Sequence, residues 1–154
     1  METKEITLTR TFDAPREKVW SAWTNASEVQ AWWGPRGTTI PVCELDAQVG
    51  GKMHIVMLAG PELGPMAGQK WPMQGIFQTV DGPNTLVFTN QALDDNGSVI
   101  IDGLTTAIFE DVSGKTKLTV TTGGSSDAPQ AAQMLGGMEQ GWNQQLDKLA
   151  EYLA

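Results

Sequence analysis

The sequence predicts an α+β fold, in which a curved antiparallel sheet wraps around one long C-terminal helix. From Asp127 to Ala154, large apolar residues recur every three or four positions, which is the spacing of one helical face. The middle of the chain instead shows short segments of alternating polarity, separated by turn residues, which is typical of strands. A single amphipathic helix after such a chain must bury its apolar stripe against the sheet. The stripe comprises Met134, Met138, Trp142, Leu146, Leu149 and Leu153.

The expected element order is β-α-α-β-β-β-β-β-β-α. Residues 4–12 alternate in polarity and predict an opening strand. Pro15 suits the first turn of a short helix that follows. Asn25 with Glu28 three residues later resembles a capping box, which predicts a second short helix ending near Trp32. Asp127 with Gln130 resembles another capping box at the start of the long helix.

Six strands are expected between the helices, because turn residues such as Gly82-Pro83 and Asn96-Gly97 separate the alternating segments. Their expected ranges are 38–44, 52–58, 71–80, 85–90, 99–111 and 115–122. Residues 59–70 are rich in Gly and Pro and predict a mobile loop or a hairpin end. Alternation predicts that the apolar residues of these strands share an inward face: Met53, Ile55, Met57, Trp71, Met73, Phe77, Phe109, Leu118 and Val120.

Composition limits the function classes. The 154 residues are 40% apolar and 18% charged, which predicts one globular domain over residues 1–154. A net charge of −8 argues against nucleic acid and against anionic membrane surfaces as partners. Cys43 is the only cysteine, which excludes an internal disulfide and fits a reducing compartment. The polar N-terminal segment and the lack of a long apolar run predict a cytoplasmic protein without membrane insertion.

The residues that could carry chemistry have simpler structural interpretations. His54 lies between Met53 and Ile55, so alternation turns it away from their face. Cys43 has no histidine near it in sequence and fits a buried or half-buried strand position. Asp94-Asp95-Asn96 is best interpreted as a turn, because it lacks the spacing of a calcium loop. We therefore assign no catalytic residue, no metal ligand and no cofactor.

Two features near the helices suggest a pocket. Gly136, Gly137 and Gly141 lie within the long helix, where glycine costs about 0.5–1 kcal/mol relative to alanine. They indicate either close approach of the sheet or empty volume that a ligand would fill. Trp32-Trp33 could gate that volume, or one Trp could close the core while the other lies half exposed. Arg36, on the expected rim, could meet a carboxylate ligand.

The ordered segments of this chain resemble a known family. They are Phe12-Asp13-Ala14-Pro15, Val19-Trp20, Trp32-Trp33-Gly34-Pro35, Gly50-Gly51, Met57, Leu86-Val87-Phe88-Thr89, Phe109-Glu110-Asp111, Gly114-Lys115-Thr116, Leu118, Met138, Gly141-Trp142, Leu146 and Leu149. On these segments the chain is similar to the START-like superfamily, also called the SRPBCC or helix-grip superfamily. Within it, the chain resembles bacterial proteins similar to the C-terminal domain of the heat-shock-protein-90 ATPase activator. The resemblance implies a helix-grip fold with a pocket, and it does not imply one reaction.

Three function hypotheses follow from the residues and the resemblance. The first is a protein that binds a small apolar or aromatic molecule between the long helix and the sheet. The second is a stress-response or co-chaperone-like protein-interaction module, either monomer or homodimer. The third is a cyclase- or hydrolase-type enzyme that uses the same cavity. A cavity would favour the first, a filled core with an exposed apolar patch the second, and a perturbed titratable group inside a cavity the third. The expected ligand lining is Trp33, Met53, Ile55, Met57, Trp71, Met73, Phe77, Phe88, Phe109, Met134, Met138 and Trp142.

Overall fold

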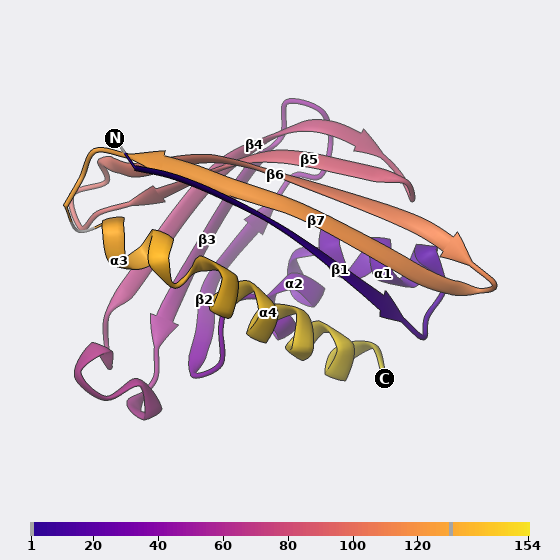
Figure 1. The fold of residues 1–154 in the computed structure, drawn as a ribbon, viewed down its shortest axis with the longest axis horizontal. Coiled ribbons are helices and arrows are strands. Elements are labelled where there is room, and N and C mark those ends of the chain that lie inside the picture. The colour runs from indigo at the N-terminus through magenta and orange to yellow at the C-terminus, as the bar shows by residue number, and fades with distance from the viewer. Residues whose placement is uncertain (1, 130) are drawn as a thin grey trace.

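The computed structural model of the chain describes residues 2–129 and 131–154. Over this part of the chain, seven strands form one curved antiparallel sheet, and the helices lie on its inner side (Figure 1). This is the α+β helix-grip arrangement that the sequence predicts. The elements are β1 (Glu2–Phe12), α1 (Arg16–Thr24), α2 (Ala26–Trp32), β2 (Thr38–Leu45), β3 (Lys52–Ala59), the short 3-10 helix η1 (Pro61–Met66), β4 (Lys70–Asp81), β5 (Thr85–Leu93), β6 (Val99–Val112), β7 (Lys115–Ser126), α3 (Ala131–Gly136) and α4 (Met138–Leu153).

The sheet has the strand order β1-β7-β6-β5-β4-β3-β2. The strands from β2 to β7 pair with their neighbours in sequence, as successive hairpins. β1 joins the far end of this series by pairing with β7, from Glu2 opposite Ser126 to Phe12 opposite Thr116. The first and last strands of the chain therefore lie side by side.

The alternation of the strands is confirmed by burial. Met53 and Ile55 of β3 are buried, whereas His54 between them is exposed. In β4, Phe77 is buried while Gln74 is exposed. The inward side chains of the sheet form one apolar core with the helices, because each strand buries one face only.

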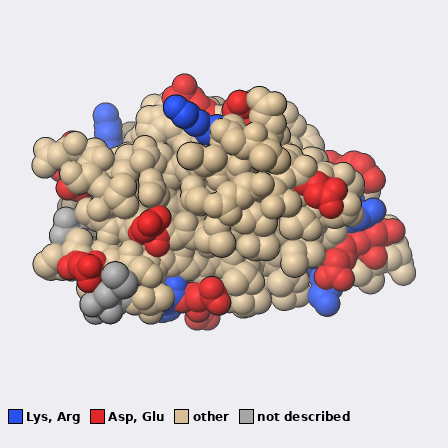
Figure 2. Space-filling view, turned by 90° about the horizontal axis from the view of Figure 1, so that it is seen from above, with Lys and Arg blue, Asp and Glu red and all other residues tan. Residues whose placement is uncertain are grey.

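The outer face of the sheet carries few charges near its middle. Figure 2 views this face, and the acidic and basic side chains lie mostly around its margin. Ile76 on β4 and Leu104 and Ile108 on β6 are 48%, 45% and 40% exposed. Their partners in the neighbouring strands are Lys52 for Ile76, Gly123 for Leu104 and Thr119 for Ile108.

The prediction of one helix from Asp127 to Ala154 is wrong. The chain forms two helices, α3 and α4, which meet at Gly137, where φ is −91° and ψ is 0°. Two consecutive glycines have the weakest helix propensity of any non-proline pair, and neither has a side chain to pack across the joint. The expected contribution of Gln130 to a capping box lies outside the described residues.

The start of α2 also differs from the prediction. Asn25 precedes the helix, but its side chain makes no capping bond to the backbone of α2. Its Nδ2 instead donates to Ser21 Oγ at 2.6 Å and to Glu28 Oε2 at 3.1 Å. The Asn25 amide therefore joins α1 to α2. It can do so because Asn25 is the only residue between the two helices.

None of the helices over the described residues is both long and apolar enough to span a membrane.

Candidate functional site

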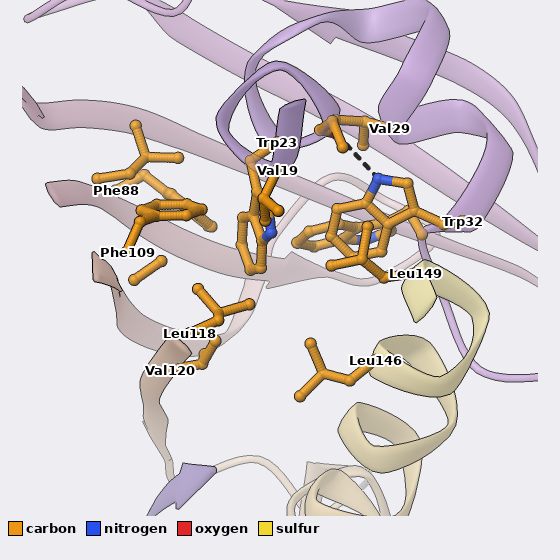
Figure 3. Packing of buried hydrophobic residues seen from close by; sticks show 14 of the residues in the cluster. Val19, Trp23, Val29, Trp32, Phe88, Phe109, Leu118, Val120, Leu146 and Leu149 are labelled. Carbon is orange, nitrogen blue, oxygen red and sulfur yellow. Dashed lines mark hydrogen bonds between the residues drawn. The ribbon is translucent and has the colours of Figure 1, made fainter. Parts of the chain in front are cut away.

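Aromatic side chains from four elements meet beneath α4. Trp23 of α1 lies among them, between Phe109 and Trp32 (Figure 3). Its ring lies 6.0 Å from that of Phe109, edge to face, and 6.1 Å from that of Trp142, with which it stacks at 15°. Trp33 meets Trp142 at 5.5 Å in a T-shaped contact. These offset and edge contacts are the favourable geometries of aromatic pairs.

Both tryptophans of the Trp32-Trp33 pair are buried, at 0% and 5% exposure. The alternative in which one ring lies half exposed is therefore wrong. Trp32 satisfies its only polar atom by donating from Nε1 to the carbonyl of Ala22 at 2.9 Å (Figure 3). The tryptophan that lies half-buried over this aromatic cluster is Trp142.

Two buried side-chain donors have no acceptor among the described residues. They are Trp23 Nε1, on a side chain 2% exposed, and Gln145 Nε2, on a side chain 5% exposed. The amide of Gln145 is oriented by the backbone N–H of Gly34, which donates to Oε1 at 2.9 Å. A buried polar group without a partner costs about 1–3 kcal/mol, so native folds rarely keep one without a reason.

The edge of the cluster is closed by polar contacts between α4 and residues 33–36, here called the rim loop. Arg36 N–H donates to Gln144 Oε1 at 3.0 Å, and Lys148 Nζ donates to the carbonyls of Trp33 and Gly34 at 3.0 and 3.1 Å. The Arg36 guanidinium forms an ion pair with Glu151. α4 is therefore attached to the rim loop through side-chain contacts from several successive turns.

Gly34 is required where the rim loop meets β2. Its φ is +84°, a conformation that residues with a side chain rarely adopt. A Cβ at this position would lie 2.6 Å from Thr38 Oγ1 and 3.2 Å from Met57 Sδ. Both the dihedral angle and the packing therefore select glycine, and its N–H and C=O are then free to bind α4.

Charged groups lie at the rim of the cluster. Burial lowers the pKa of Lys148, and the nearby positive charge of Arg36 lowers it further. The hydrogen bond from Arg36 lowers the pKa of Glu151. The buried polar side chains of the described interior are uncharged: Thr105, Thr116, Thr122, Ser126 and Gln145.

A second polar contact attaches the C-terminal end of α4. Tyr152 OH donates to Glu28 Oε1 of α2 at 2.8 Å. Burial acts to raise the pKa of Glu28, but hydrogen bonds from Ser21, Tyr152 and Asn25 outweigh it, so that the pKa is lowered. The same hydrogen bond raises the pKa of Tyr152.

The residues expected to line a ligand site divide into two groups. Most of them lie in the core cluster beneath α4, either buried or packed partly buried against it: Trp33, Met53, Ile55, Met57, Met73, Phe77, Phe88, Phe109 and Trp142. The remaining ones lie elsewhere. Trp71 is half-buried, Met138 packs in a separate cluster with Ile101 and Leu135, and Met134 is 36% exposed. The break at Gly137 separates Met134 from the stripe of α4, whereas Met138 is the first residue of α4.

Two hollows of the described structure lie at the surface instead of inside the core. One, of about 280 Å³, lies between β1 and α3 and includes Thr3 and Leu135. The other, of about 490 Å³, lies beside Arg36, Lys148 and Tyr152. None of the expected lining residues borders either hollow, and their side chains pack against one another.

Gly136 and Gly141 do not mark a tight contact with the sheet. A Cβ on Gly136 would meet nothing within 4 Å, and one on Gly141 would meet only Pro35 Cβ at 4.0 Å. Gly141 therefore faces the rim loop, beside Trp142.

The isolated candidates for chemistry behave as expected from their sequence positions. His54 is exposed, with Nδ1 3.3 Å from Glu44 Oε1. Burial raises the pKa of the Cys43 thiol to about 11, which keeps it protonated and poorly nucleophilic. Asp94 Oδ1 accepts the backbone N–H groups of Asn96 and Ser98, as in a turn. Among the described residues, no cluster of three or more His, Cys, Asp or Glu side chains could hold a metal ion.

The lining predicted from the sequence includes neither Trp23 nor Gln145. The position of Gln145 did carry a signal, because it follows Trp142 by three residues and precedes Leu149 by four. A polar residue on the apolar stripe of a helix must be buried with the stripe. The absence of an acceptor for Trp23 could not be inferred, because it depends on the tertiary packing.

Comparisons with known proteins agree with this architecture. A family model described as Activator of Hsp90 ATPase homolog 1-like protein matches residues 13–154. A solved structure from Chromobacterium violaceum is 27% identical, with a TM-score of 0.78, and the match covers 97% of this chain and 96% of that one. A Silicibacter pomeroyi protein named for the same family is 24% identical, with a TM-score of 0.77 and 97% of each chain covered. A search of curated proteins gave no match.

Proposed function

The chain belongs to the family of Activator of Hsp90 ATPase homolog 1-like proteins, and we propose that it binds a small apolar or aromatic molecule between α4 and the sheet. The proposal takes the aromatic cluster as the ligand environment and α4 as its cover. Small-molecule sites are typically apolar with few polar groups, and because this cluster is filled by its own side chains, a ligand would have to displace one of them to enter.

The observation that carries the proposal is the position of Trp142. Its half-buried ring contacts the buried rings of Trp23 and Trp33, and it stands on α4, which buries Leu146, Leu149 and Leu153 in the same core and is joined to the rim loop by polar side chains. A small outward movement of α4 would expose aromatic surface without unpairing any strand. The ligand would then replace Trp142 as the partner of those rings.

The expected affinity follows from burial. A two-ring aromatic molecule has an area comparable with a large aromatic side chain, about 250 Å². At about 25 cal/mol per Å², its burial contributes about 6 kcal/mol. That corresponds to a dissociation constant of roughly 10–100 μM before the cost of moving α4 is subtracted.

A reversible cross-link between α4 and the rim loop tests the proposal. A Cβ on Gly141 would lie 4.0 Å from Pro35 Cβ, within the usual Cβ–Cβ range of a disulfide. We therefore propose the variant Pro35→Cys with Gly141→Cys, in a Cys43→Ala background that prevents mispairing. The probe is the fluorescent apolar dye N-phenylnaphthylamine, titrated into the oxidised and the reduced protein.

We expect the reduced protein to bind the dye and the oxidised protein to bind it at least tenfold more weakly. Addition of reductant to the oxidised sample should restore binding, which makes each sample its own control. Equal binding in both states would contradict the proposal, because the dye would then not need movement of α4. Lack of binding to wild type would contradict it as well.

A second candidate is self-association, which the exposed apolar residues of the outer sheet face favour. Two copies of a chain with a net charge of −8 repel each other over most of their surface. The middle of the outer face carries fewer charges than its margin (Figure 2), and Ile76, Leu104 and Ile108 are exposed on it, with Lys52 opposite Ile76 in the neighbouring strand. We propose a second copy of the chain as the occupant, packed sheet on sheet.

Sedimentation velocity over a range of concentrations tests this candidate. We expect a dimer of the wild type, and loss of the dimer in Ile108→Lys. Val49→Lys is the matched control, because Val49 is 71% exposed in the turn before β3. A wild type that stays monomeric, or an equal effect of both substitutions, would contradict it.

A further inference from the structure

We infer that Trp23 Nε1–H and the Gln145 amide N–H groups form a polar subsite for a neutral carbonyl oxygen of the bound molecule. This inference rests on the proposed function and names the class of ligand, an aromatic ketone, amide or ester. It starts from the two buried side-chain donors that have no acceptor among the described residues.

Groups next to each of these two donors do find hydrogen-bond partners. Trp32, which contacts Trp23 in the same cluster, donates its Nε1–H to a backbone carbonyl at 2.9 Å. Gln145 has its Oε1 fixed by Gly34 N–H, so its Nε2 cannot exchange places with the oxygen to find a partner. The Trp32 indole and the Gln145 amide oxygen thus have hydrogen-bond partners. The Trp23 indole N–H and the Gln145 amide N–H groups, which lie next to them, have none among the described residues.

The two donors border the same aromatic pair. Trp23 stacks on Trp142 at 6.1 Å and meets Trp33 edge to face at 6.1 Å. Gln145 follows Trp142 by three positions on α4, one turn of the helix, and is bonded to Gly34, the residue after Trp33. A molecule that displaces Trp142 from these rings would therefore lie against the Trp23 indole and within one helical turn of Gln145.

The chemistry of the surroundings selects the group that they bind. Both unpaired atoms are donors, so the ligand must supply an acceptor; a carbonyl oxygen does so without bringing an O–H donor that would itself need a buried partner. The buried polar side chains of the described interior carry no charge, so a carboxylate would lose its hydration without a cation to replace it. Lys148, the nearest helix cation, is engaged at the rim by two backbone carbonyls. A neutral carbonyl meets both conditions.

A pair of probes of nearly equal size tests the inference. Acetylnaphthalene has a carbonyl group where ethylnaphthalene has a methylene. The ratio of their affinities therefore measures the contribution of the hydrogen-bond acceptor apart from that of the naphthalene ring. We expect wild type to bind acetylnaphthalene about tenfold more tightly in calorimetric titration, the factor that corresponds to about 1.4 kcal/mol. The variants Gln145→Met and Trp23→Phe should each reduce this preference by severalfold.

Gln144→Met is the matched control. Gln144 makes the corresponding bond to the rim loop, from Arg36 N–H to Oε1, and it is not one of the two unpaired donors. It should change the affinity for both probes equally and leave the preference unchanged. The ratio of the two affinities in each variant also removes any effect of loosened packing, because both probes experience it.

The outcomes separate the inference from the proposed function. Binding of both probes with equal affinity would overturn the inference and assign the donors to bound water, while the apolar site would stand. A preference that survives in Gln145→Met and in Trp23→Phe would also overturn it. Binding of neither probe would overturn the proposed function and the inference together.

Discussion

Gly34→Ala should destabilise the protein far more than the addition of one methyl group suggests. An alanine at φ +84° costs roughly 1–2 kcal/mol in backbone strain. The added Cβ would lie 2.6 Å from Thr38 Oγ1, a position that requires the loop or β2 to move. Overpacking of this kind typically costs about 1–3 kcal/mol, so we expect a total of about 2–5 kcal/mol.

Gly97→Ala provides the matched control. Gly97 has φ +83°, nearly the value of Gly34, and a Cβ there would meet nothing within 4 Å. It should cost the strain alone, about 1–2 kcal/mol. The difference between the two variants therefore isolates the contact of the rim loop with β2 from the conformational preference of glycine.

Urea melts followed by circular dichroism give the two free energies of unfolding. With a slope of about 1–3 kcal/mol per molar urea, Gly34→Ala should lower the midpoint by about 1–3 M, and Gly97→Ala by less than half as much. Removing the obstacle in the double variant Gly34→Ala with Thr38→Ala should recover part of the loss, as a double-mutant cycle measures. Equal losses in the two single variants, or no recovery, would refute the packing argument for residues 33–36.

Three further perturbations have defined outcomes. Trp142→Ala should lower the free energy of unfolding by about 2–4 kcal/mol in urea melts, less than for a fully buried Trp because its ring is half-buried. Cys43 should react with iodoacetamide at pH 8 much more slowly than free cysteine, since its thiol pKa is raised to about 11, and urea should remove the protection. The hydrogen bond from Tyr152 to Glu28 should stabilise the fold at intermediate pH. Because the pKa of Glu28 is lowered, this contribution is lost as pH falls below about 4.5 and Glu28 is protonated. Because the pKa of Tyr152 is raised, it is also lost as pH rises above about 10 and Tyr152 is deprotonated. Thermal melts of Tyr152→Phe should therefore depend less on pH at both ends, and an unchanged profile would contradict this.

The arrangement of helices and sheet, and the buried face of each strand, could be predicted from the sequence, because both follow from the spacing of apolar residues. Met53, Ile55 and Phe77 are buried at the positions that alternation assigns them, since a strand has only two faces. The break at Gly137 was missed because the apolar stripe continues across it, and periodicity alone does not register a change of helix axis.

The edge of the candidate site was less accessible. Gln144 and Lys148 look like ordinary solvated positions of a helix, and their partners are backbone groups of residues 33–36, more than a hundred positions away. Backbone donors and acceptors have no signature in sequence, so such contacts become visible only in three dimensions. The burial of both Trp32 and Trp33 has the same origin, because α1, α2 and α4 enclose the pair from different sides.

The pairing of β1 with β7 has a consequence for how the chain acquires its structure. β1 is synthesised first, yet every one of its strand partners lies in residues 116–126. At about 5–20 residues per second, a ribosome needs roughly 5–20 seconds to supply them after β1 is complete. During that time the hairpins from β2 onward can form from local contacts, whereas β1 must wait with Ile6 and Leu8 unpaired. The pairing of β1 with β7 therefore has the largest sequence separation of any strand pair described. We expect it to form late in folding. Until then, β1 should be the strand most exposed to mispairing or to binding by a chaperone.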